Sequence, residues 1–103
     1  MVLYGPQEDI HKFREYYEQT HLPIAQTLPG IRSTRLTFDV NTIEGKSPYV
    51  AIFEADFDST DALFAALDSP EGQRAQADLP NYVTGPVLML HFPSRPAFPT
   101  DEA

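Results

Sequence analysis

The stretch YYEQTHLP, residues 16–23, carries an amphipathic helical pattern into a proline. Around it, apolar side chains recur at helical spacing in a row that also contains His21: Ile10, Phe13, Tyr17, Ile24 and Leu28. Pro23 cannot donate an N–H to the carbonyl of Gln19, and its ring disfavours helical geometry at the preceding residue. We therefore expect this helix to end or kink at residues 20–22, with His21 on its buried side.

The rest of the chain predicts four strands and two further helices. The strands, each apolar and bounded by turn residues, are expected at residues 1–4, 31–40, 49–57 and 87–92. Asp58 or Ser59 can cap a helix that stops at Ser69, and Ser69 can cap a shorter helix that has Pro70 in its first turn. This order of elements predicts an α+β fold: a ferredoxin-like split βαβ domain, with a four-stranded antiparallel sheet and helices on one face.

Two of the expected strands, residues 49–57 and 87–92, are apolar on both faces. An antiparallel sheet that is covered by helices on one side normally exposes polar side chains on the other. The second face therefore needs a cover, and a partner sheet is the simplest one. We expect a homodimer related by two-fold symmetry, a dimeric α+β barrel.

Length and composition indicate one small acidic domain. We place it at residues 1–93 of the 103-residue chain, and we expect residues 94–103 to be a Pro-rich, extended or disordered tail. The formal net charge of −8 repels phosphate backbones and anionic lipid surfaces, so neither nucleic acid nor a membrane is an expected partner. The chain has no cysteine, no long apolar run and no basic leader, which favours a soluble, cytoplasmic protein.

Three residues are candidates for catalysis. A neutral imidazole at His21 could act as a base or an acid, or its ring N–H could merely satisfy the carbonyl that Pro23 leaves unpaired. Tyr17 lies one helical turn earlier and could exchange a proton with His21, or it could be a core aromatic. His91 interrupts an apolar strand, and it could share a pocket with His21 or be a satisfied residue near the strand end.

Five further side chains could line a pocket for a hydrophobic ligand: Phe38, Tyr49, Phe53, Tyr82 and Met89. The aromatic members of this set could equally form the core. The three histidines lack metal-ligand spacing, so no metal site is expected. Neither a Gly-x-Ser-x-Gly elbow nor a Gly-rich phosphate loop occurs, so the sequence predicts no cofactor.

Three sequence blocks resemble the EthD-like branch of the dimeric α+β barrel superfamily. They are the pattern F-x-x-Y-Y-x-x-x-H-x-P at residues 13–23, continuing to Leu-Pro-Gly at 28–30, the block at residues 57–72, and ADLPNY at 77–82. Tyr17 stands where this family often has tryptophan. The resemblance implies a homodimer that works in small-molecule metabolism, often on hydrophobic aromatic or polyketide-like compounds. Relatives in the wider superfamily include dehydratases, cyclases, isomerases and cofactor-free monooxygenases, and many members have no assigned activity.

Two functions follow as hypotheses. The first is an enzyme that carries out cofactor-independent proton transfer, such as dehydration, isomerisation or cyclisation, on a hydrophobic oxygenated compound in a degradative or secondary-metabolic pathway. His21 would be the base or acid, and Tyr17 and His91 would polarise or orient the substrate. The second is a non-catalytic dimeric binding or accessory protein that holds a hydrophobic metabolite and assists an oxygenase. The sequence leaves open whether the chain is catalytic.

Overall fold

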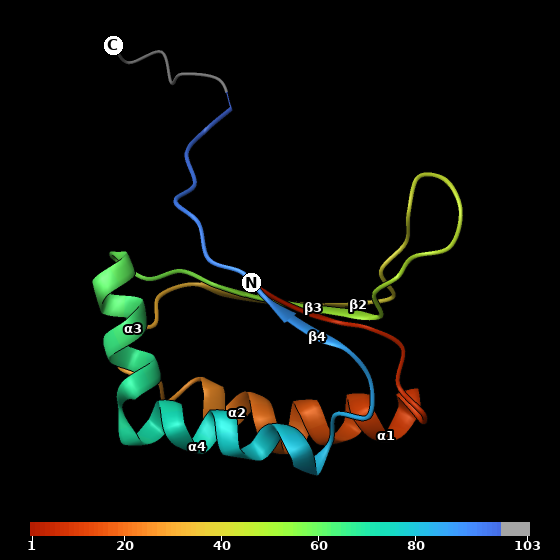
Figure 1. The fold of residues 1–103 in the computed structure, drawn as a ribbon, viewed down its shortest axis with the longest axis horizontal. Helices are drawn as coiled ribbons and strands as arrows, with labels where there is room; N and C mark the ends of the chain where they lie inside the picture. Colours follow the sequence, from red (N-terminus) through yellow and green to blue (C-terminus); the bar gives the residue numbers. More distant parts are fainter. Residues whose placement is uncertain (98–103) are drawn as a thin grey trace.

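The computed structural model describes residues 1–97 and contains one sheet with helices on a single side (Figure 1). Its strands are β1 (Val2–Tyr4), β2 (Thr34–Phe38), β3 (Ala51–Ala55) and β4 (Val87–Met89). They lie side by side in the order β2-β3-β1-β4, and all three pairings are antiparallel. The predicted ferredoxin-like α+β fold is confirmed. Residues 98–103, which belong to the predicted tail, lie outside the described residues.

Three of the helical elements within residues 1–97 begin at a capping side chain. The helical elements are α1 (Ile10–Tyr16), η1 (Tyr17–His21), α2 (Leu22–Ala25), α3 (Thr60–Asp68), α4 (Pro70–Asp78) and η2 (Leu79–Asn81). The Asp9 carboxylate accepts the first free N–H groups of α1. Ser59 and Ser69 accept in the same way at the starts of α3 and α4, as predicted, and Pro70 occupies the first turn of α4.

The sequence predicted that the first helix would end or kink at residues 20–22, and the structure changes helix type there without ending the helical stretch. The chain stays helical through η1, which is a single π-helical turn, and then continues as α2. Leu22 N–H donates to the carbonyl of Tyr17, five residues back instead of four. After this wider turn Pro23 lies in the first turn of α2, where a missing N–H does not interrupt the hydrogen bonding.

The core lies between the sheet and the helices and is mainly aromatic. Seven buried residues form it: Tyr4, Phe13, Tyr17, Ala25, Ala51, Phe53 and Tyr82. Tyr4 meets the rings of Phe13 and Tyr17 edge to face, with centroids 5.2 and 5.4 Å apart. Two of the predicted ligand-lining residues, Phe53 and Tyr82, are therefore part of the packed interior.

No helix within residues 1–97 covers the opposite face of the sheet (Figure 1). Strand pairing places Leu3, Ile52 and Leu88 side by side there, because directly opposed residues point to the same face. Leu3 is 9% exposed in the middle of the sheet, whereas Leu88 near the edge is 45% exposed. Leu90 lies on the same side by alternation and is 44% exposed. We call these four residues the open face.

Strand β4 is shorter than the predicted segment at residues 87–92. Beyond Met89, the amide of Leu90 donates to the carbonyl of Met1, and the amino group of Met1 donates to the carbonyl of Leu90. Residues 90–97 form neither strand nor helix. Among the residues that the structure describes, no helix is both long and apolar enough to cross a bilayer.

Gly72 marks the closest approach between α3 and α4. A Cβ atom added there would overlap the backbone carbonyls of Ala66 and Leu67 at the end of α3. We expect Gly72→Ala to lower the free energy of unfolding by about 1–3 kcal/mol, because rigid backbone must move apart. Arg74→Ala, at an exposed position on the same helix, should change it little. Urea unfolding curves compare the two variants, and equal stability would contradict the packing described.

Candidate functional site

The strongest candidate site is a buried pair formed by His21 and Asp78. His21 ends η1 and Asp78 ends α4, so the pair joins the first helical stretch to α4. His21 Nδ1 lies 2.9 Å from an Asp78 carboxylate oxygen, and the two side chains are only 7% and 8% exposed. The π-helical turn presents His21 toward the core, against the rings of Tyr17 and Tyr82, whose centroids lie 5.2 and 4.7 Å from the imidazole.

Two further residues hold the Asp78 carboxylate in place. The hydroxyl of Tyr16 donates to its other oxygen at 2.6 Å, and Asn81 Nδ2 donates to that same oxygen at 3.0 Å. Burial works to raise the pKa of Asp78, but the hydrogen bonds from Tyr16, Asn81 and His21 outweigh it and hold that pKa below its ordinary value of 3.8. Asp78 is therefore ionised at neutral pH, and it accepts a hydrogen bond from His21.

This arrangement fixes the tautomer of His21 and leaves its second nitrogen free. With an ionised carboxylate at Nδ1, the proton of a neutral imidazole lies on Nδ1, so Nε2 is an acceptor. No residue in the range 1–97 is hydrogen-bonded to Nε2. Within the same range no fully buried side-chain nitrogen or oxygen lacks a partner, so Nε2 must reach accessible surface. The imidazole is thus buried and oriented by Asp78, and its Nε2 has no protein partner within residues 1–97 and keeps some accessible surface.

Three buried tyrosines make up the wall beside this pair. The Tyr4 hydroxyl lies 3.4 Å from that of Tyr17 and 3.1 Å from that of Tyr82. Burial raises the pKa of all three phenols, so each is a neutral hydroxyl at ordinary pH. Tyr17 was predicted to pair with His21; its ring does pack against the imidazole, but its hydroxyl points to Tyr4.

The remaining predicted site residues lie in several places. His91 packs against Phe64 of α3, with ring centroids 5.3 Å apart, and makes no described contact with His21. Phe38 packs edge-on against Tyr17. Met89 is exposed on β4, and Tyr49 lines a pocket on the loop between β2 and β3. The structure therefore brings Tyr17 and Tyr82 to His21, and it brings neither His91 nor Met89 there.

Sequence reasoning missed Asp78, Tyr16 and Asn81. One signal was available for Asp78, because an acidic residue at the C-terminal end of a helix is unfavourable for the helix dipole and calls for another partner. Asn81 follows three residues later, in the same ADLPNY block. Tyr16 and Tyr17 could not be told apart, since only the structure shows that Tyr16 turns its hydroxyl toward α4.

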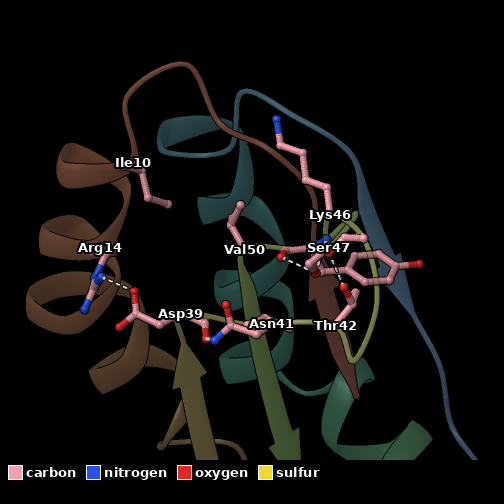
Figure 2. A pocket seen from close by; sticks show the side chains of 11 residues that line it. Ile10, Arg14, Asp39, Asn41, Thr42, Lys46, Ser47 and Val50 are labelled. Atoms are coloured by element: carbon pink, nitrogen blue, oxygen red, sulfur yellow. Dashed lines mark hydrogen bonds and ion pairs between the residues drawn. The ribbon is translucent and has the colours of Figure 1, made fainter.

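Two hollows lie near α1. The helix groove, about 470 Å³ in volume, separates α1 from residues 81–84, and its lining includes Phe13, Tyr16, Asn81 and Tyr82. The loop pocket, about 450 Å³, lies between α1 and the loop at residues 39–50 (Figure 2). Three of the groove residues also contact His21 or Asp78. Residues 1–97 contain no group of three or more histidine and acidic side chains arranged to hold a metal ion.

Comparison with known proteins identifies the family and the fold. The family described as the EthD domain matches residues 6–86. The chain belongs to the EthD family. An uncharacterized 11.0 kDa protein from the thcB-thcC intergenic region of Rhodococcus erythropolis is 31% identical over 90 residues, which are 86% of each chain. A solved structure of an ethyl tert-butyl ether d (EthD) family protein from Bacillus halodurans C-125 superposes with a TM-score of 0.74. It is 26% identical, and the match covers 87% of this chain and 94% of the other.

The EthD match covers both segments that form the site. Residues 6–86 contain both the π-helical turn that carries His21 and the segment from Asp78 to Tyr82. The resemblance noted in the sequence is therefore confirmed at the level of family and fold. The roles of individual residues in this EthD protein depend on the geometry of its own side chains.

The lowered pKa of Asp78 predicts how stability changes with pH. A carboxyl group whose pKa is lower in the folded protein contributes stability above its unfolded value, 3.8, and loses it as the pH falls through the folded value. We expect Asp78→Asn to lower the free energy of unfolding by about 2–3 kcal/mol at neutral pH, because a buried charged partner of His21 is lost. The difference from the unchanged protein should shrink as the pH falls below about 4.

A matched control is Asp58→Asn. Asp58 also has a lowered pKa, from its hydrogen bond and ion pair with Arg32, but both side chains are mostly exposed. Urea unfolding at several pH values should show a much smaller effect for Asp58→Asn. A difference between unchanged protein and Asp78→Asn that stays constant down to strongly acidic pH would contradict the assigned charge state.

Proposed function

We propose that this EthD protein catalyses cofactor-independent proton transfer on a small hydrophobic, oxygenated compound, with His21 as the base and then the acid. The observation that supports this most is the open Nε2 of a buried imidazole whose Nδ1 is bonded to an ionised Asp78. An oriented histidine with one free nitrogen is suited to general acid–base work, which contributes about 10²–10⁴-fold to a rate. Asp78 touches no substrate in this scheme; it is a positioning residue.

The proton that His21 removes from the substrate would be released again later in the reaction. Nε2 would take a proton from a carbon next to a carbonyl group, and the bonding electron pair would move onto the carbonyl oxygen. The imidazolium, stabilised by Asp78, would then release the same proton. In an isomerisation the proton returns to another atom of the compound; in a dehydration it joins the departing hydroxyl, which leaves as water. In a cyclisation it goes to the alkoxide formed by ring closure.

The surroundings of the pair support a hydrophobic substrate. The rings of Tyr17 and Tyr82 pack against the imidazole, and the helix groove is lined by further aromatic side chains, Phe13 and Tyr16. We assign Tyr17 a packing role beside His21, in place of the proton relay first considered, and we leave His91 out of the scheme. The name of the solved relative refers to ethyl tert-butyl ether, itself a small hydrophobic oxygenated compound.

Replacing His21 tests the proposal directly. We expect the protein to accelerate hydrogen–deuterium exchange next to the carbonyl in a panel of hydrophobic ketones and aldehydes in heavy water, followed by NMR. His21→Gln should reduce that exchange to the background rate, because glutamine cannot accept and release the proton. His11→Gln, on the exposed face of α1, should keep the rate of the unchanged protein.

Two results would decide against the enzyme. Exchange that His21→Gln leaves intact would remove His21 from the mechanism. The other result is a ligand that raises the melting temperature of the unchanged protein and of His21→Gln equally, with no hydrogen–deuterium exchange catalysed by either. That result would favour the non-catalytic binding or accessory protein. A third variant separates orientation from chemistry: Asp78→Asn, if folded, offers an amide at Nδ1 and should slow the exchange without abolishing ligand binding.

We also propose that two copies associate through the open face. Leu3, Ile52, Leu88 and Leu90 form a continuous apolar surface on a sheet that no helix within residues 1–97 covers there. Water contact with such a surface is unfavourable by about 25 cal/mol per Å² of apolar area, so covering it with the same sheet of a second copy is stabilising. Because the face lies opposite the helices, this association would leave the His21–Asp78 pair of each copy intact.

Sedimentation velocity tests the dimer at micromolar concentration. We expect the unchanged protein to sediment as a dimer, and Leu88→Asp to sediment as a folded monomer, because a charge would be buried opposite its own counterpart. Ala65→Asp adds the same charge at an exposed position of α3 and should remain dimeric. A monomeric unchanged protein with an intact circular dichroism spectrum would overturn this part of the proposal.

A further inference from the structure

The loop pocket is distinguished by its charge. The chain has seven lysine and arginine residues against fifteen acidic ones, yet Arg14 and Lys46 both line this one hollow, with Asp39 as its one acidic residue. Figure 2 shows Arg14 on α1 and Lys46 on the loop, on opposite sides of the pocket. The hollow is therefore locally cationic on a protein whose overall charge repels anions.

Within residues 1–97, Arg14 and Lys46 both have N–H donors without a hydrogen-bond partner. Lys46 forms no ion pair with any other residue in the range 1–97. Arg14 has a single hydrogen bond, from Nη1 to Asp39 at 3.3 Å, which is long for a charge-assisted contact. Its remaining N–H groups have no described partner. By contrast, Arg32 and Arg35 are each paired with acidic side chains near the ends of β2 and β3.

Arg14 is nevertheless held in position. Its guanidinium carbon lies 4.5 Å from the ring centroid of Phe38, in a cation–π contact, while Phe38 packs edge-on against Tyr17 in the core. The cation–π contact and the hydrogen bond to Asp39 together restrict the position of the guanidinium, while its other N–H groups have no partner among residues 1–97.

The loop that carries Lys46 is also preformed. The amide of Asn41 donates to the carbonyl of Asp39 at 2.8 Å, and the Thr42 hydroxyl donates to carbonyls of the same loop. The Ser47 hydroxyl donates to the Tyr49 carbonyl and accepts from the Tyr49 amide. Asp39 has a left-handed φ of 56°, which is an uncommon backbone conformation for a residue other than glycine. Its side chain lies beside Arg14.

We propose that the loop pocket binds a small organic carboxylate. The carboxylate would take hydrogen bonds from the N–H groups of Arg14 that have no described partner, and Lys46 would attract it by charge from the other side of the pocket. Its hydrocarbon or aromatic body would pack against Ile10, Tyr49 and Val50, which also line the pocket. This inference concerns binding alone, and it does not rest on proton transfer by His21. The helix groove is a natural contrast, because its charged lining is three acids against one lysine, Lys12.

The experiment uses benzoate and hexanoate as probes, with benzamide and hexanamide as neutral partners of the same shape. We expect titration followed by backbone amide NMR to show shifts at residues 39–50 with both carboxylates and much weaker shifts with the amides. Lys46→Gln, an exposed loop substitution, should weaken binding of the carboxylates by about two- to fivefold, because one of the two positive charges in the lining is lost. Arg14→Gln should weaken it at least as much.

Lys12→Gln is the matched control. It removes the same charge from α1 beside the helix groove, and it should leave carboxylate binding at the loop pocket unchanged. Raising the ionic strength from about 0.01 to about 1 M should weaken binding of the carboxylates and not of the amides. Equal affinity for carboxylate and amide, equal loss with Lys12→Gln and Lys46→Gln, or no shifts at residues 39–50 with either carboxylate would each overturn the proposal. None of these results depends on exchange activity at His21.

Discussion

The hydrogen bond between His21 and Asp78 is the contact on which the rest of the site depends. It joins two residues that lie 57 positions apart, and it is nearly closed to water. An ionised carboxylate in such a place is stable only because Tyr16 and Asn81 donate to it as well, so the charge is distributed over three partners. The same contact determines which nitrogen of the imidazole remains free. The same pair of side chains therefore links two elements of the fold and orients the histidine for the proposed chemistry.

The aromatic core lies beside this pair, and two hollows lie along α1. Tyr4, Tyr17 and Tyr82 satisfy one another through their hydroxyls, so the interior beside His21 is polar at a few atoms and apolar everywhere else. The helix groove and the loop pocket lie against different parts of α1, and their linings differ in charge. One helix thus separates an acidic, aromatic hollow near the proposed catalytic histidine from a cationic hollow at the edge of the sheet.

The sequence predicted the fold well because its signals are local. Strand alternation, the serine caps and the two prolines near helix starts each act within a few residues, and their order was enough to predict a ferredoxin-like domain. The site was harder, since it depends on which side chains meet across the fold. His21 stood out by its place beside Pro23, whereas Asp78 could be assigned to it only once α4 was packed against the first helical stretch. His91 was grouped with His21 because strand parity gives a face but gives no neighbour on another element.

The π-helical turn also sets the phase of the whole first helical stretch. The buried positions there are Phe13, Tyr17, His21 and Ala25, each four residues after the last, and Ala25 replaces the Ile24 of the predicted row. In a regular α-helix of 3.6 residues per turn, three steps of four would rotate the side chain by about 120° away from its starting direction. The wider turn takes up part of that rotation. A single additional backbone residue per turn therefore keeps a histidine, two aromatic rings and an alanine in register along one line of the core.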